Sequence, residues 1–385
     1  MIFLIDFGMN SYFSYTLDMK TYLLYQNLTN MVPFFISFLS LGTPFAVVYL
    51  SSLQKKKTDI YLLEANMIVL FMAFSAILFA CILYVFDYVQ AYILFAIILA
   101  FFNVIKQNAV IYFLALKRLA VASFIRLNQK IVYGAVSLLL INVIYVNETV
   151  LGMILIFGEV VGFVILTQKY RIIAIQKVKK IKSILKVSRY SFFTNAIGAL
   201  TISLPVILLN YYKYASKEII VFAIAFSMLK YSSIILGPFM QLVTPYFTPL
   251  KNDKLLVKNY YKKFFWLILF LSLVVTLFCY ALGPLIINLF FEKEYMGAGA
   301  LFQILSFSIP FMFLNTFTMI IISSIQSIKK TFKITLIGFV FVVTSLVGCT
   351  YFHCSLSFIA FVICLGYLFD FLISSMSFLI YMKEK

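Results

Sequence analysis

The chain has 385 residues, of which 64% are hydrophobic and 11% charged, and its mean hydropathy is +1.06. Soluble domains are about 45–50% apolar and about 25% charged, so this composition predicts a polytopic membrane protein and excludes a disulfide scaffold, a coiled coil and a disordered chain. The formal net charge of +18 would suggest a nucleic-acid partner on a soluble protein. The placement of the basic residues decides what this charge means.

Apolar segments long enough to cross about 30 Å of hydrocarbon recur along the chain. The predicted spans are 23–50, 60–86, 88–114, 123–145, 150–168, 187–212, 219–247, 259–291, 298–325, 333–352 and 356–381. Residues 1–17 form a shorter twelfth candidate, because a helix of that length reaches only about 25 Å and Asp6 and Asn10 interrupt it. This segment lacks the basic start of a signal peptide. About twelve helices, the first one short, are therefore expected.

Most of the 31 basic residues fall in alternate connections and at the adjoining helix ends. These basic stretches are 55–57, 117–130, 169–189, 251–263, 329–333 and 383–385. Short loops rich in Lys and Arg stay in the cytoplasm, so the C-terminus is predicted to be cytoplasmic. The net charge is then mainly a topology signal, and no nucleic-acid partner is expected.

The longest basic connection lies near the middle of the chain, from Lys169 to Arg189. Isoleucines recur in it at three-residue spacing with lysines between them, which predicts an amphipathic helix that binds anionic lipid headgroups at the inner interface. An ordinary solvated basic loop is the alternative. With the short first helix counted, the chain divides into an N-terminal lobe (1–168), a connector (169–186) and a C-terminal lobe (187–385), with six helices in each lobe.

Apart from the basic residues assigned to the connections and adjoining helix ends, two lysines lie inside the predicted spans. Each buried charge is costly in hydrocarbon unless it faces a cavity or a partner. Lys230 is near the middle of the 219–247 span and precedes a helix-interrupting Gly237–Pro238 pair, so its ammonium is a candidate ligand for a phosphate group. An ion pair with Glu159 is the alternative. Lys106 is the second candidate, and it could instead extend to the interface.

Two carboxylates also lie deep in spans, Glu159 and Asp370. Either could couple transport to H⁺ or Na⁺, or serve as a structural hydrogen-bond partner between helices. Glu64, Arg126 and Lys130 lie closer to the predicted inner interface, where gate or topology roles are expected.

Catalysis has little support in the sequence. The single histidine, His353, lies beside Cys354, whereas metal ligands come in clusters. The five cysteines include no C-x-x-C pair, and we interpret them as small hydrophobic residues. A disulfide between Cys349 and Cys354 is possible, but nothing else in the sequence supports it. No Walker loop, G-x-S-x-G or H-E-x-x-H motif occurs. We therefore expect neither an enzyme nor a metal or organic cofactor.

Several long stretches resemble a known group of transporters. YSFFTNAIGALTISLPVILLNYY, FAIAFSMLKYSSIILGPFMQLVTPYFTPL and the segment around LIINLFFEKEYMGAGALFQ are similar to the polysaccharide transporter branch of the MOP superfamily, the Wzx-type flippases. The resemblance implies a MATE-like, V-shaped transporter of two six-helix lobes. Such a protein moves an undecaprenyl-diphosphate-linked oligosaccharide, such as an O-antigen unit of lipopolysaccharide, to the outer leaflet for a polymerase or ligase.

The resemblance also implies roles for particular residues. Lys230 occupies a place at which related flippases are proposed to hold the diphosphate, while H⁺ or Na⁺ coupling carries over loosely to Glu159 or Asp370. The short first helix departs from the family pattern. Two alternatives stay open. An O-antigen polymerase, a membrane glycosyltransferase, would need a large external loop with arginines, and a drug or cation antiporter of the same fold would need an acid cluster in the N-terminal lobe, for which Glu64 and Glu159 are candidates.

Overall fold

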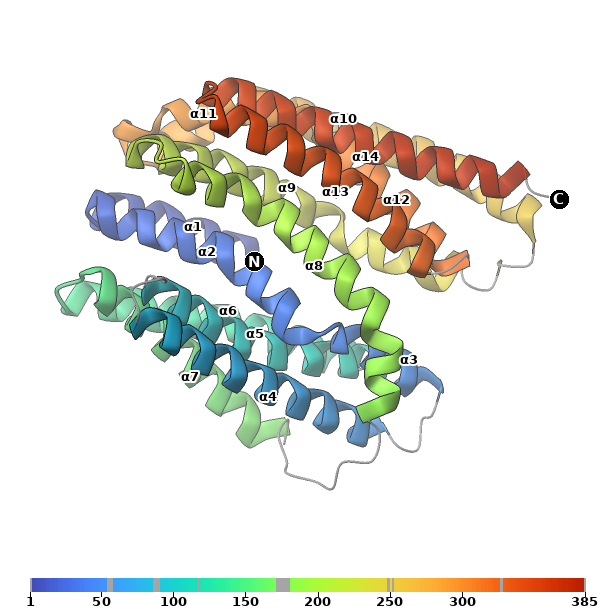
Figure 1. Ribbon diagram of the computed structural model, residues 1–385, viewed down its shortest axis with the longest axis horizontal. Helices are drawn as coiled ribbons and strands as arrows, with labels where there is room; N and C mark the ends of the chain where they lie inside the picture. Colours follow the sequence, from blue (N-terminus) through green and yellow to red (C-terminus); the bar gives the residue numbers. More distant parts are fainter. Residues whose placement is uncertain are drawn as a thin grey trace. The chain divides into compact units, whose positions relative to one another are not determined.

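The computed structural model describes residues 2–53, 58–85, 91–116, 118–170, 181–247, 250, 253–325 and 328–383. Over these ranges the only regular secondary structure is helical, as the composition predicts (Figure 1). The chain forms two compact units, Met1–Ser203 and Leu204–Lys385. The boundary between these two units lies inside one helix. This division does not test the predicted lobes 1–168 and 187–385, which remain predictions. Residues 171–180 of the expected connector lie outside the described residues.

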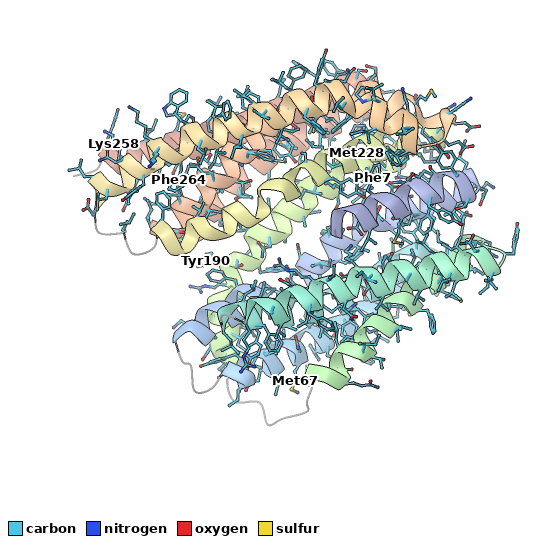
Figure 2. All side chains as sticks on the ribbon, turned by 180° about the vertical axis from the view of Figure 1, so that it is seen from behind. Phe7, Met67, Tyr190, Met228, Lys258 and Phe264 are labelled. Atoms are coloured by element: carbon cyan, nitrogen blue, oxygen red, sulfur yellow. The ribbon has the colours of Figure 1, made fainter. Side chains whose placement is uncertain are left out.

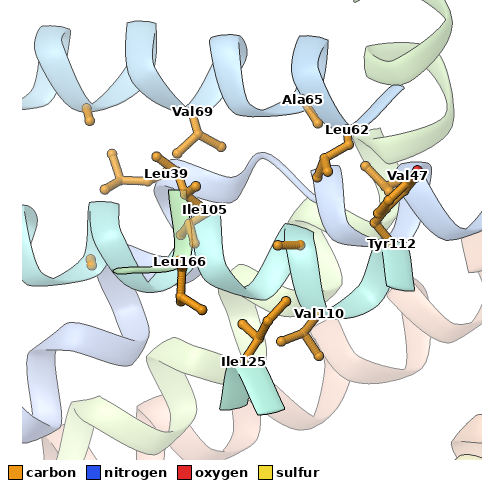
Figure 3. Packing of buried hydrophobic residues seen from close by; sticks show 14 of the residues in the cluster. Leu39, Val47, Leu62, Ala65, Val69, Ile105, Val110, Tyr112, Ile125 and Leu166 are labelled. Atoms are coloured by element: carbon orange, nitrogen blue, oxygen red, sulfur yellow. The ribbon is translucent and has the colours of Figure 1, made fainter. Parts of the chain in front are cut away.

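The first unit is organised around one central helix. Its helices are α1 (Ile2–Thr16), α2 (Met19–Ser40), α3 (Thr43–Leu53), α4 (Thr58–Val85), α5 (Ala91–Ala115), α6 (Leu119–Val143), α7 (Glu148–Tyr170) and the first part of α8 (Ile181–Tyr211). Helix α5 packs against α2, α3, α4, α6 and α7. Buried small residues such as Ala100 and Ala109 on α5 and Ala65 on α4 let these helices approach closely. Figure 3 shows the larger side chains that fill the space around them, including Val69, Ile105 and Leu166.

The predicted span 23–50 is broken into two helices. Helix α2 ends at Ser40, and Leu41 and Gly42 adopt positive φ angles of 45° and 71° before α3 begins at Thr43. A Cβ atom on Gly42 would lie 2.6 Å from the backbone oxygen of Ser188 on α8. Glycine is therefore required here both by the left-handed backbone and by the close approach of α8. The expectation of one continuous span was wrong at this point.

The second unit contains the rest of the chain. Its helices are the end of α8, α9 (Ser216–Phe247), α10 (Lys254–Phe290), the short 3₁₀ helix η3 (Lys293–Tyr295), α11 (Gly297–Ser306), α12 (Ile309–Ile325), α13 (Ile328–Tyr351) and α14 (Leu356–Lys383). Helix α9 packs against α11 and α12, and α14 packs against α11, α12 and α13. The predicted span 298–325 is bent by 46° between α11 and α12.

Eight of the described helices are long and apolar enough to cross a membrane, or nine if the bent α11–α12 pair is one span. Helix α1 has 15 residues, which agrees with the predicted short first helix. Large apolar side chains such as Phe270 and Leu277 are exposed along α10, as expected for a surface that faces lipid. Figure 2 shows such side chains along the helices, with Lys258 near the start of α10. The expected all-α polytopic membrane fold is confirmed.

Candidate functional site: buried charges in each unit

The deepest charges of the first unit form an ion pair. The Nζ atom of Lys106 on α5 donates a hydrogen bond to Oε2 of Glu159 on α7, and both side chains are buried, Lys106 completely. Asn103, nearly one turn before Lys106 on α5, donates to the other carboxylate oxygen of Glu159 at 3.4 Å. Gly162 of α7 lies beside the ammonium, since a Cβ atom there would be in ordinary van der Waals contact with Nζ at 3.7 Å. Lys106 is buried and bonded to Glu159, so it does not extend to the interface. That alternative was therefore wrong.

A second ion pair lies beside the first, between α6 and α1. Lys130 Nζ donates to Asp6 Oδ1 at 2.7 Å, and about a quarter of each side chain is exposed. Tyr133, nearly one turn along α6, is within electrostatic reach of Glu159 and Asp6. Gly158 allows α7 to approach closely, because a Cβ atom there would lie 3.1 Å from the Tyr133 backbone oxygen. Helices α1, α5, α6 and α7 therefore bring two lysines and two carboxylates together as two ion pairs.

Two other predicted gate residues lie elsewhere in this unit. Glu64 is buried on α4 and Arg126 is half-buried on α6. Near Glu64 along α4, the amide of Asn66 accepts a hydrogen bond from Asn108 of α5 at 2.9 Å, and Thr43 at the start of α3 donates to Asn108 at 3.3 Å. This polar group joins three helices, and sequence reasoning missed it, because an isolated Asn in an apolar span gives no indication of its partner.

A polar group also ties α1 to α2. Tyr22 donates to Oδ1 of Asn10 at 2.9 Å, and Gln26 donates to the same oxygen at 2.6 Å. Asn10, Tyr22 and Gln26 are all buried. In the sequence Asn10 appeared only as an interruption of a short apolar segment. Its buried contacts explain why a helix too short to span a bilayer is held against the rest of the unit.

In the second unit the predicted cation and the predicted acid lie on different helices. The Lys230 Nζ on α9 is 4.9 Å from the ring centroid of Phe226, one turn earlier, and the lysine is half-buried. Asp370 on α14 lies against Gly338 of α13, so closely that a Cβ atom on Gly338 would be 1.6 Å from the Asp370 Oδ1 atom. Because glycine has no Cβ atom, position 338 leaves the space that the Asp370 carboxylate occupies.

Metal binding has no support in this part of the molecule. Among the described residues, no group of three or more His, Cys, Asp and Glu side chains could hold a metal ion. His353 contacts the ring of Tyr214, with 5.2 Å between the ring centroids. What the described residues offer is therefore ion pairs, a carboxylate packed on a glycine, and a half-buried lysine. Such groups can bind charged ligands or exchange protons.

Comparison with known proteins identifies the fold. No protein-family model matches the chain, and no curated protein matches it in sequence. Solved structures do match it. A multidrug resistance MATE family transporter of the MOP superfamily is similar in its outward-facing conformation (TM-score 0.73, 12% identity, 99% of this chain and 92% of that chain).

The same match is found with other conformations. The inward-facing conformation of a multidrug resistance MATE family transporter gives a TM-score of 0.71 at 13% identity over 99% of this chain and 94% of that one. A MATE structure in the bent conformation gives 0.70 at 11% identity over 99% and 93%. The chain therefore has the fold of the MATE family transporters of the MOP superfamily.

Proposed function

We propose that this protein is a flippase that moves an undecaprenyl-diphosphate-linked oligosaccharide across the bacterial inner membrane by alternating access. The fold supports a transporter, because similar MATE structures are known in inward-facing and outward-facing conformations. It also favours a transporter over the alternative of a membrane glycosyltransferase. The substrate class rests on the charges.

The observation that carries the substrate class is the pairing of acids with lysines in the first unit. Glu159 is bonded to Lys106 and Asp6 to Lys130, so neither carboxylate offers an uncompensated negative charge to a cationic drug. In the second unit Lys230 places a cation about halfway along α9. A charge distribution of this kind favours an anionic substrate, and a diphosphate is the anion that such a lipid carries.

The ion pair also suggests how coupling could work. Lys106 can bind a phosphate oxygen only after its bond to Glu159 opens, and protonation of Glu159 would remove the charge that holds it. In this proposal Glu159 exchanges the coupling proton, Asp370 is the second coupling candidate, and Na⁺ is the alternative ion. Anionic lipids at the cytoplasmic face and a separate polymerase or ligase are the expected partners.

A drug or cation antiporter is the second candidate. It is favoured by Asp370, whose carboxylate lies in the space that Gly338 leaves between α13 and α14. A carboxylate in such a space could hold a cation or a proton. Two of the similar structures are of multidrug resistance transporters, so the fold is compatible with this function as well.

Reconstitution into liposomes separates the two functions. We would measure movement of a fluorescent undecaprenyl-diphosphate-linked sugar and, in parallel, uptake of a fluorescent organic cation. Lys230→Ala should abolish flipping, and Lys230→Arg should retain part of it. Lys258→Ala, at an exposed position on α10, is the matched control and should flip normally. Cation uptake without lipid flipping would overturn the proposal in favour of the antiporter.

A further inference from the structure

The helices α8 and α13 of the second unit end in the same type of turn. At the end of α13, His353 has a positive φ of 49°, its N–H donates to Thr350 at 3.2 Å, and the N–H of Cys354 donates to the Cys349 carbonyl at 2.9 Å. This pair of hydrogen bonds, five residues to two and six to one, defines a Schellman motif. Because of this turn, the chain folds back directly after the last turn of α13.

At the end of α8 the same pair of hydrogen bonds is formed. Lys213 has a positive φ of 56° and donates to Asn210 at 3.1 Å, while Tyr214 donates to Leu209 at 3.0 Å. Tyr214 then reaches across to the turn after α13, where its hydroxyl donates to the Cys354 carbonyl at 3.0 Å. The two turns therefore support each other.

In the turn at the end of α13, two cysteines occupy the positions whose side chains frequently meet in a Schellman motif. Cys349 is the last-turn residue that accepts the six-to-one hydrogen bond, and Cys354 is the residue that donates it. Side chains at these two positions frequently contact each other in Schellman motifs. The backbone hydrogen bond from Cys354 to Cys349 brings the two residues together at 2.9 Å, and both are half-buried with free thiols. Such proximity is what a disulfide requires.

We propose that Cys349 and Cys354 are a modification site that is oxidised to a disulfide in the mature protein. The basic residues at the start of α13 and at the end of α14, Lys329, Lys330 and Lys383, place the opposite ends of both helices outside the cytoplasm by the positive-inside rule. The turn between α13 and α14 then faces the compartment in which disulfides form and persist. This inference is independent of the transported substrate.

The chemistry is thiol–disulfide exchange with an oxidised dithiol–disulfide protein or a small disulfide RSSR of that compartment. The Cys354 or Cys349 thiolate attacks one sulfur of the donor, which forms a mixed disulfide and releases one RSH. The second thiolate then displaces the other RSH, forming the Sγ–Sγ bond. Two protons and two electrons pass from the cysteines to the donor, which leaves as two thiols.

The bond would fasten the last turn of α13 to Cys354, two residues before α14 begins at Leu356. The Tyr214 hydroxyl bonds to the backbone of Cys354, so the α8–α9 connection would gain from the same constraint. The expected result is a protein with higher thermal stability in the oxidised form than in the reduced form, because the cross-link restricts the unfolded chain.

Counting reactive thiols tests the proposal. The chain has five cysteines. Denatured full-length protein, purified from membranes with thiol–disulfide exchange quenched by acid during lysis, should take up three maleimide groups before reduction and five after it, as read by intact mass. In Cys349→Ser, all four remaining cysteines should react without reduction. Cys279→Ser is the matched control and should take up two groups before reduction and four after it.

Two outcomes would overturn the proposal. Five maleimides on the unreduced wild-type protein would mean that the thiols stay free, whether because the turn faces the cytoplasm or because the pair does not react. If two thiols of Cys349→Ser still failed to react with maleimide before reduction, the disulfide would belong to another pair of cysteines. A second measurement is the melting temperature, which a reductant should lower in the wild type and leave unchanged in Cys349→Ser.

Discussion

Lys106 and Glu159 form an ion pair between α5 and α7 that is almost completely shielded from solvent. The two residues are remote in sequence, and each alone would be an expensive charge in an apolar helix. Together with Asn103, which bonds the second carboxylate oxygen, they satisfy one another. The pair therefore contributes to the packing of the first unit, whatever its part in transport.

The buried pair should respond unequally to single and double substitutions. Lys106→Met leaves the Glu159 carboxylate buried without its cation, and removal of one partner of a buried pair typically costs about 3–5 kcal/mol. We expect a loss of that order in the free energy of unfolding, measured by titration with sodium dodecyl sulfate in mixed micelles. The double variant Lys106→Met, Glu159→Met should recover most of this loss. A double variant as unstable as the single one would show that the pair does not act as a unit.

The second ion pair provides a contrast, because its side chains are about a quarter exposed. Asp6→Asn removes the charge that Lys130 contacts at 2.7 Å. Partly exposed pairs contribute about 0.2–1 kcal/mol, so the same titration should show a loss below about 1 kcal/mol. The loss should shrink further in high salt, which screens accessible charges. A loss as large as that of Lys106→Met would mean that solvent does not reach this pair.

The sequence predicted which charges matter better than it predicted their partners. Lys106, Glu159 and Asp370 stand out because a charged group in a long apolar segment is costly and therefore rare. Which residue satisfies each of them depends on the rotation and packing of helices, which hydropathy does not determine. The pairing of Glu159 with Lys106, and the placing of Asp370 on Gly338, could be found only in three dimensions.

Backbone breaks were the other feature that hydropathy did not predict. Residues 23–50 are apolar enough on average to read as one span, yet the chain breaks at Leu41 and Gly42. At this break Gly42 lies against α8, which is distant in sequence. The short first helix was predicted correctly because its length is a local property, whereas the polar contacts of Asn10 that hold it were not foreseen.

Gly42 should tolerate no side chain. Gly42→Ala would place a Cβ atom 2.6 Å from the Ser188 oxygen at a φ of +71°, and both the close contact and the left-handed backbone are unfavourable for alanine. We expect a loss of roughly 1–3 kcal/mol in unfolding free energy. Gly198→Ala on α8 is the matched control, because nothing lies within 4 Å of its added Cβ. Equal effects of the two substitutions would contradict the close approach of α8.

Gly338 and Asp370 should be coupled. The Cβ of Gly338→Ala would overlap the Asp370 carboxylate, so the carboxylate must leave its place or α13 and α14 must separate. Overpacking of this kind typically costs about 1–3 kcal/mol. Gly348→Ala lies on the same helix with open space around its Cβ, so it should be neutral or slightly stabilising, since alanine favours helix more than glycine by about 1 kcal/mol.

The test of this coupling is a double-mutant cycle in unfolding free energy. Asp370→Ala removes the atoms that an alanine at 338 would meet, so the double variant Gly338→Ala, Asp370→Ala should be more stable than the sum of the single effects predicts. The same cycle with Gly348→Ala should be additive. Additive effects in the Gly338 cycle would show that the Asp370 carboxylate does not lie against Gly338. Another group would then have to fill the space beside Gly338 between α13 and α14.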